Sequence, residues 1–470
     1  MDFLVFLALL TALALVTTYL IKRYTKHPTF YVVTVLRTTR LNAFFDTLKD
    51  RKMLEYLTII GSILGFGAFG FDFFIGNKIQ NKFLRVGAFL AVTAVLGYLF
   101  GFLFNGFITD NPLLPITDPL IVQLAFGLGG FSFAISLFLL FSALHIIGTT
   151  IAGGKTCPGI APVLPGVDIP NVDFTPPVEA WISLFLILVV HEASHGFLSR
   201  RHNVTVKHSG VLTFGPFPIG AFVEPDEEQI KQLSAQKAVQ IFAAGPTSNF
   251  VSMILVLIAA LLVGTFVTGP LVAPFENHVI ETRFSGVTIS HVDQNVVFCR
   301  TAYPSSAFDA GIESGTKILK INGDTIHGVT ELRQHIAAYP HQSLRFTLEK
   351  DGRIFDQNLS PNALGQFGVR LQATPNPDYV EPPQNQQLLY SGYALGASIL
   401  AWFILLSFFV AISNFLPIVP FDGGRMAELI FAPYFGFMGM NDPDTRTLVK
   451  RLFLWILVPI LLANVAPLFF

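Results

Sequence analysis

A pair of histidines stands at the end of a long apolar run and limits the folds open to this chain. The run from Trp181 to Val190 is almost wholly apolar and leads directly into His-Glu-Ala-Ser-His at positions 191–195. Residues four apart lie on one face of a helix, so His191 and His195 can offer two imidazoles to one zinc ion. Glu192 lies beside them, where a zinc-activated water would be. Histidines and acids are costly in lipid, so at membrane depth they indicate a functional site.

The composition predicts a membrane protein in contact with the lipid bilayer. Hydrophobic residues make up 52% of the 470 residues and charged residues only 13%, unlike an average soluble protein. The formal net charge is −1 and there is no basic stripe, so no nucleic acid partner is expected. Cys157 and Cys299 are too few for a cysteine-ligated zinc site. The two cysteines could form one disulfide with each other if both face an oxidising compartment.

Several apolar segments have about the 20 residues that a bilayer requires. They predict a polytopic α-helical membrane protein with about eight transmembrane helices, at residues 3–21, 57–75, 86–108, 121–147, 180–199, 239–267, 388–416 and 452–470. No basic residue precedes the first segment, which favours a retained helix with its N-terminus outside. A removed signal peptide is the alternative.

Counting crossings from an external N-terminus places residues 191–195 toward the cytoplasm. The loops that follow the fifth and seventh segments are basic, with Arg200 and Arg201 in one and Arg425 in the other, which agrees with that orientation. Lys78, Lys82 and Arg85 disagree, because the count puts their loop outside. Either this loop is an exception, or one of the flanking segments is not a full crossing.

A soluble insert is predicted at residues 275–383, outside the cytoplasm. It contains β-patterned runs, and its segment AFDAGIESGTKILKINGD at 307–324 resembles PDZ domains of membrane and periplasmic proteases. The resemblance implies an inserted PDZ-like α+β domain, with a helix at Val329–Ala338. Such domains bind a peptide by adding it as a strand to a sheet edge. The alternative is a rigid spacer or a gate without a peptide ligand.

A catalytic zinc needs a third protein ligand, and Asp422 is the best candidate. It belongs to the segment NFLPIVPFDGG at 414–424, which ends the seventh apolar segment. Pro417 and Pro420 break the helix, and Gly423 and Gly424 allow unusual backbone angles. Broken backbone at membrane depth is tolerated where it lines a wet cavity. An ordinary interfacial turn with a surface aspartate is the alternative.

Together these motifs resemble the site-2 protease family of intramembrane zinc metalloproteases. The family pairs HExxH with a later Asn-x-x-Pro-x-x-Pro-x-Asp-Gly element, and a Gly-Pro-x-x-Asn element matches residues 245–249. The resemblance covers residues 181–426 and implies one Zn²⁺ per chain. It makes Asn249, and after it Asn414, candidate donors to the developing oxyanion. It also implies that the β-like stretch 205–223 is a membrane-reentrant β-hairpin, although a hairpin lying on the bilayer surface is the alternative.

The predicted organisation has four parts. Residues 1–150 form N-terminal transmembrane helices without an assigned role, and residues 178–270 form the first part of the catalytic membrane core. The PDZ-like domain follows at 275–383, and the second part of the core with the final helix at 386–470. Few cysteines and no recognised signal peptide fit a prokaryotic cell membrane.

The predicted function is a zinc-dependent intramembrane endopeptidase that cuts transmembrane protein substrates in regulated intramembrane proteolysis. Three alternatives are a non-catalytic scaffold with a peptide-binding PDZ-like domain, a zinc-handling membrane protein, and a membrane peptidase acting on soluble or prenylated chains. Glu192 argues against the scaffold, because a structural zinc site has no use for that acid. A zinc-handling protein should carry further intramembrane clusters of His and Asp, and the sequence contains only isolated cases such as Asp72 and His145.

Overall fold

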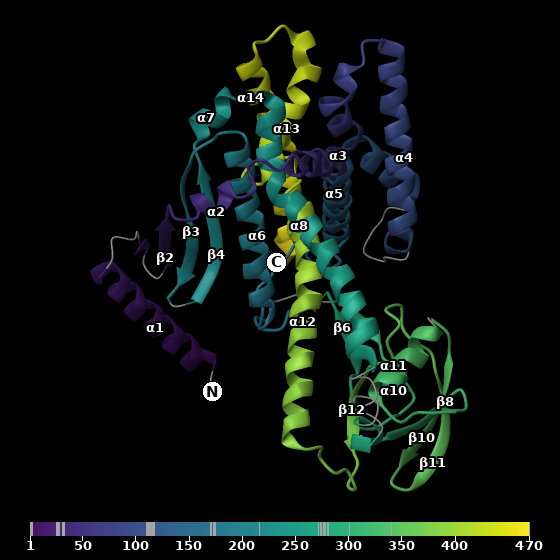
Figure 1. Cartoon of the computed structure of the whole chain (residues 1–470). Coiled ribbons are helices and arrows are strands. Elements are labelled where there is room, and N and C mark those ends of the chain that lie inside the picture. The colour runs from purple at the N-terminus through teal and green to yellow at the C-terminus, as the bar shows by residue number, and fades with distance from the viewer. Residues whose placement is uncertain are drawn as a thin grey trace.

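Long apolar helices dominate the computed structural model (Figure 1). It describes residues 3–24, 29–30, 33–109, 118–169, 172, 175–215, 217–270, 272, 275, 279, 282–299, 301–339 and 341–469. Within these ranges, seven helices are long and apolar enough to cross a membrane. They contain the second to sixth predicted segments and most of the seventh and eighth, and the first segment forms a further helix. The helices are α1 (Phe3–Tyr24), α3 (Met53–Phe74), α4 (Lys82–Thr109), α5 (Pro119–Ile151), α6 (Ala180–Arg201), α8 (Ala235–Val263), α12 (Gln384–Ser413) and α14 (Asp442–Val465).

Helix α3 folds back on itself at Gly67, whose φ of 57° only glycine adopts readily. A Cβ on Gly70 would strike the carbonyl of Ser62, although eight helical residues normally span about 12 Å. Both ends of α3 lie toward the same end of the bundle. Glu55 Oε1 accepts from Arg201 Nε at 2.8 Å, and the Phe73 carbonyl accepts from Gln236 Nε2 at 2.9 Å. Helix α3 is therefore a helical hairpin and not a complete crossing.

Helix α5 folds back in the opposite sense at Gly130, which has φ 60°. Its first part runs antiparallel to α4, where Gln123 packs on Gly101. Gly101 is about 24 Å along α4 from Arg85, so this contact lies toward the opposite end of α4 from the basic loop. After Gly130 the chain returns toward Cys157, which is bonded to Cys299 of the insert. The fold-back of α3 and α5 counts against eight complete crossings, and the number of crossings stays a prediction.

The two helical hairpins meet tip to tip. A Cβ on Gly67 would lie 2.6 Å from the amide nitrogen of Gly130, so neither glycine has room for a side chain. This arrangement accounts for the basic loop that contradicted the crossing count. Because α3 returns to the end where it began, that loop lies on the same side as Arg201. Arg85 itself binds Asp72, with Nε 2.6 Å from Oδ1, and Tyr434 Oη donates to Asp72 Oδ2 at 2.6 Å.

The predicted β-hairpin is present as β3 (Val206–Phe214) and β4 (Phe217–Pro225), but it is part of a larger sheet. Strands β1 (Thr29–Phe30) and β2 (Val33–Thr38) extend it, in the order β1-β2-β3-β4. At the turn of the hairpin, a Cβ on Gly215 would lie 2.7 Å from Cα of Ala14, near the midpoint of α1. The N-terminal segment therefore extends the sheet, and among the described residues β4 has no further strand on the side of α6, where it forms a free edge.

The insert folds around its own hydrophobic core, which includes Val287, Ile318, Leu332 and Leu348. Its main sheet has the order β11-β10-β8-β5-β12, and α11 (Val329–Ala338) has the predicted bounds. The remaining elements are β5 (Phe284–Val292), β6 (Asn295–Phe298), β7 (Thr301–Pro304), α10 (Ser306–Asp309), β8 (Lys317–Ile321), β9 (Asp324–Thr325), β10 (Leu344–Lys350), β11 (Arg353–Leu359) and β12 (Val369–Pro375). The possible disulfide is formed, with Cα atoms of Cys157 and Cys299 4.6 Å apart.

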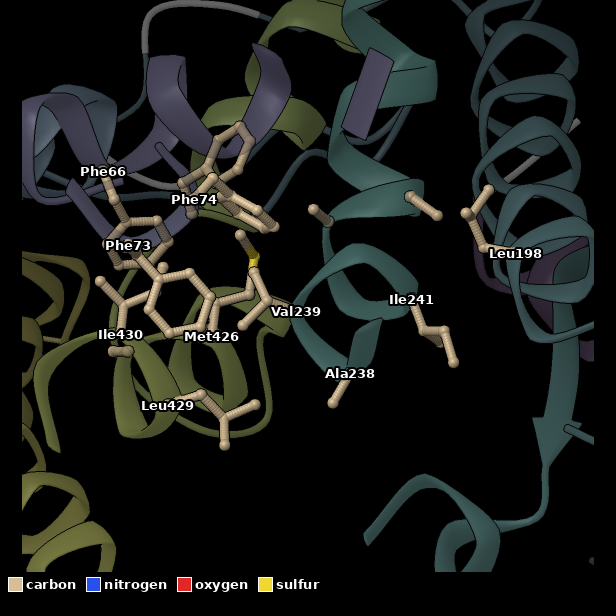
Figure 2. Close-up of a cluster of buried hydrophobic side chains, with 14 of the residues drawn as sticks. Phe66, Phe73, Phe74, Leu198, Ala238, Val239, Ile241, Met426, Leu429 and Ile430 are labelled. Atoms are coloured by element: carbon tan, nitrogen blue, oxygen red, sulfur yellow. The ribbon is translucent and has the colours of Figure 1, made fainter. Parts of the chain in front are cut away.

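The largest apolar cluster joins α3, α8 and the short helix α13 (Asp422–Phe431), as Figure 2 shows. Phe66 and Phe74 of α3, Val239 of α8, and Met426 and Ile430 of α13 are buried in it. Because lipid is as apolar as these side chains, close van der Waals packing stabilises the cluster more than transfer from water does. The cluster holds α13, which carries Asp422, against α8.

Candidate active site

Helix α6 carries the histidines and the acid of the HExxH motif. His191 and His195 lie one turn apart with ring centroids 5.0 Å from each other, and both are buried. The helix ends about two turns after His195 in a Schellman-type C-cap, in which a non-glycine residue takes the left-handed conformation. Asn203 takes a left-handed φ of 59°, and the amide of Val204 donates to the carbonyl of Ser199 at 2.8 Å.

Asp422 is brought to the histidines by the irregular segment that follows α12. Its Oδ2 lies 3.1 Å from His191 Nε2 and 3.3 Å from His195 Nε2. The amide of Gly423 donates to the carbonyl of Asn414 at 2.6 Å and closes the loop. Gly423 and Gly424 are needed because the backbone is packed closely around them, and not for the unusual backbone angles that the sequence predicts. Neither has a positive φ; instead a Cβ on Gly424 would lie 2.5 Å from the backbone nitrogen of Val419.

The three side chains fit a catalytic zinc ion. Among the described residues, His191, His195 and Asp422 are the one group of metal-ligating side chains whose donor atoms converge, all within 4.8 Å of one another. Two imidazole nitrogens and one carboxylate oxygen leave a fourth position open, as catalysis requires. The backbone of Gly245 on α8 forms the wall of this space. A Cβ there would clash with His191 Nε2 and lie 2.6 Å from His195 Nε2.

Each histidine is held at its other ring nitrogen. His195 Nδ1 lies 2.8 Å from the carbonyl of Ile241, and His191 Nδ1 lies 3.0 Å from the carboxamide of Asn249. Asn249 is fully buried, and its Oδ1 has no partner in the described structure. An imidazole that offers Nε2 to a metal carries its proton on Nδ1 and needs an acceptor there. Rotating the carboxamide by 180° gives Asn249 Oδ1 that role, and satisfies it.

Glu192 is not part of the ligand group, and its carboxylate is bound to strand β4. Its Oε2 accepts a hydrogen bond of 2.9 Å from the amide of Val223, on the free edge of β4. The acid is half-buried, beside both the ligand space and a strand edge. The sequence gives no sign of the Val223 contact, because a backbone amide carries no residue signature. Gly245 could have been recognised only through the Gly-Pro-x-x-Asn resemblance.

Asn414 lies at the C-terminal end of α12. Its Nδ2 donates to the carbonyl of Val410 at 2.9 Å. The structure does not test whether Asn249 or Asn414 donates to an oxyanion, so that role stays a prediction for each. His202 is buried at the end of α6 and His208 pairs with Glu224 at 3.3 Å; neither belongs to the ligand group.

Comparison with known proteins locates the same region. Residues 179–436, more than half of the chain, match the sequence model of Peptidase family M50. An uncharacterized protein of Methanocaldococcus jannaschii is 24% identical over 252 residues, which cover 53% of this chain and 56% of the relative. The chain thus spans about half the length of this relative. The matched region contains all three converging side chains, Glu192 and the insert.

Proposed function

The chain belongs to peptidase family M50, whose members are zinc metalloproteases, and from this premise we propose that it hydrolyses peptide bonds in or near transmembrane segments of membrane proteins. The observation that carries the proposal is the convergence of His191, His195 and Asp422 next to Glu192. The two histidines and Glu192 lie on α6, a helix apolar enough to span a membrane, and Asp422 begins the short helix α13. The activity would belong to regulated intramembrane proteolysis. A scaffold or a zinc-handling protein would not need an acid placed beside the ligands but outside their set.

The residues divide the chemistry between them. The two histidines and Asp422 would hold one zinc ion, which when bound polarises the scissile carbonyl and activates water. Glu192 accepts the proton of the attacking water and delivers it to the leaving amine. The hydrogen bond from the Val223 amide fixes the orientation of this carboxylate. The Ile241 carbonyl and Asn249 keep both imidazoles turned toward the ligand space.

The free edge of β4 is the proposed docking place for the substrate. A helical segment hides its carbonyls in its own hydrogen bonds, so a transmembrane substrate must unwind before hydrolysis. An unwound segment can pair with an edge strand. Strand β4 supports this role because it is unpaired on the side of α6, and its Val223 amide reaches Glu192. The contact of Gly215 with the middle of α1 supports re-entry of the hairpin into the membrane.

Cleavage of a single-span test substrate by the purified protein tests this function. We expect Asp422→Ala to stop cleavage and reduce zinc occupancy, and a zinc chelator to stop cleavage by the unaltered protein. Mass spectrometry should place the cut within or beside the apolar segment. Asp444→Ala is the matched control, because Asp444 is exposed and outside the ligand group. If Asp422→Ala kept full zinc and normal turnover, the assignment of this ligand would be lost.

The insert is proposed to lie outside the cytoplasm. Disulfides persist in oxidising compartments, and Cys157–Cys299 ties the insert to the segment after α5. The chain has no other cysteine. In intact cells, an impermeant thiol reagent should label both cysteines after treatment with an impermeant reductant, and little before it. Labelling that appears only after lysis would show that the orientation is inverted.

A peptide ligand is proposed for the insert at the unpaired edge of β12, next to α11. This arrangement, a free strand edge beside a helix, is what strand addition needs. Titration of the full-length protein with short peptides, followed by protection of the β12 amides from hydrogen exchange, would detect the ligand. Unchanged exchange at saturating peptide would favour the spacer.

A further inference from the structure

A cavity of about 290 Å³ lies behind the segment that carries Asp422, away from the proposed site of hydrolysis. It is bounded by the short helix α7 (Glu227–Gln232), the first turns of α8 and α14, and α13. Its floor is apolar and includes Phe242 and Val419. Val419 lies three residues before Asp422, so the cavity shares a wall with the metal-binding loop.

The rim of this cavity is rich in cations. Lys231, Arg425, Arg446 and Lys450 line it together with Glu227 and Glu428, and each of the four cations forms an ion pair with a carboxylate in or beside the cavity. Nε of Arg446 is buried, and it has no hydrogen-bond partner in the described structure. A buried donor without a partner is costly and calls for an acceptor.

The ion pairs that these cations already make can be exchanged. Arg425 lies 3.0 Å from Glu227 and Lys450 lies 3.9 Å from Glu428. Arg446 pairs with Asp442, and Lys231 pairs with Glu228. At least one side chain of each pair is well exposed. Exposed pairs of this kind contribute little to stability. Burial also raises the pKa of Glu428. An incoming anion would therefore compete only with ion pairs that are exposed on at least one side.

We propose that this cavity binds a phosphate-bearing anion, with Arg446, Lys450 and Arg425 as its ligands. Its position favours a lipid headgroup as the source. Helices α8 and α14 are both candidate membrane spans, and both begin at the cavity, which places it at the end of the spanning region. Basic pockets between transmembrane helices are typical sites for anionic headgroups. The apolar floor can accept the glycerol backbone of such a lipid.

Arg425 connects the anion to the loop. Its guanidinium lies over the ring of Phe242, 5.4 Å from the centroid, and it is three residues after Asp422 on α13. An anion held by Arg425 would therefore rest against both α13 and Val419. Binding should stabilise the folded loop without taking part in hydrolysis.

Native mass spectrometry of the full-length protein in detergent tests this inference without any need for catalysis. The probes are phosphatidylglycerol, phosphatidylcholine, glycerol 3-phosphate and inorganic phosphate. Phosphatidylglycerol should be retained over phosphatidylcholine, and the double variant Arg446→Gln/Lys450→Gln should bind it roughly 30-fold more weakly. Lys78→Gln/Lys82→Gln is the matched control, because it removes two exposed cations from the same end of the bundle. It should change binding less than about threefold.

The outcomes separate the possible sources. Preference for phosphatidylglycerol identifies a lipid, and binding of the two soluble phosphates without lipid preference identifies a soluble anion; either supports the site if the double variant loses it. Thermal unfolding of each variant without ligand checks that the fold is retained. Equal binding by the double variant, or an equal loss in the control, would show general surface attraction and overturn the proposal.

Discussion

Replacing Glu192 with glutamine should lower the rate of cleavage by about 10²–10⁴-fold while zinc content remains at the wild-type level. The carboxylate acts as a proton carrier in the proposed mechanism, and glutamine cannot perform that role at neutral pH. It is not one of the three converging ligands, so its loss leaves the metal set complete. Glutamine has the same size and can still accept the hydrogen bond from the Val223 amide.

Zinc content and turnover should be measured on the same purified sample. Glu224→Gln is the matched control, since it makes the same chemical change on the same strand as Val223, at an exposed residue that pairs with His208. It should keep most of the activity. Loss of metal together with activity in the Glu192 variant would mean that Glu192 is a ligand and that its proposed role is wrong.

The smallest possible change with a large expected effect is Gly245→Ala. The added methyl group would occupy the space between His191 Nε2 and His195 Nε2, at less than any ordinary contact distance. Helix α8 cannot easily move away, because Ile241 one turn earlier holds His195 and Asn249 one turn later holds His191. We expect nearly complete loss of zinc, and with it of cleavage, from a protein that still folds.

The same helix offers a matched control for this substitution. Gly264→Ala makes the identical change just past the other end of α8, where an added Cβ would meet no atom of another part of the structure within 4 Å. It should leave zinc and turnover unchanged. Plasma emission spectroscopy measures the zinc content of both variants, and the unfolding temperature shows whether each variant is folded. Full zinc in Gly245→Ala would show that the ligand space is wider than the structure describes.

The candidate site could be predicted from the sequence where a residue's chemistry and spacing carry the information. His191 and His195 follow from helical periodicity, and Asp422 follows from its place after two helix-breaking prolines. Hydropathy predicts the spans from the length of each apolar segment, and it does not show whether the chain continues across the membrane or turns back. A helix that reverses at Gly67 has the same hydropathy as one that continues, so the two helical hairpins were missed. Only the misplaced basic loop signalled them.

Contacts between segments far apart in the chain were beyond reach for another reason. Strand β2 pairs with β3 across roughly 170 residues, in the register Val33↔Phe214 to Thr38↔Ser209. Residues 22–52 contain no sequence pattern that predicts pairing with β3. The hydrogen bond from Val223 to Glu192 likewise depends on backbone geometry alone.

The two helical hairpins that meet at Gly67 and Gly130 bear on how this chain can be divided into functional parts. The family match begins at residue 179, which suggests a minimal catalytic unit downstream of an accessory module. Yet Gly61 of α3 packs on Thr247, next to the turn of α8 that faces His191 and His195, and Gly65 packs on Phe415 of the segment before Asp422. Arg200, at the end of the HExxH helix, binds Asp46 with Nε 2.8 Å from Oδ1. Gly61, Gly65 and Asp46, all in the first third of the chain, thus contact the elements that carry the converging ligands. A protein trimmed to the family boundaries would lose these contacts and expose that side of the ligand-bearing elements.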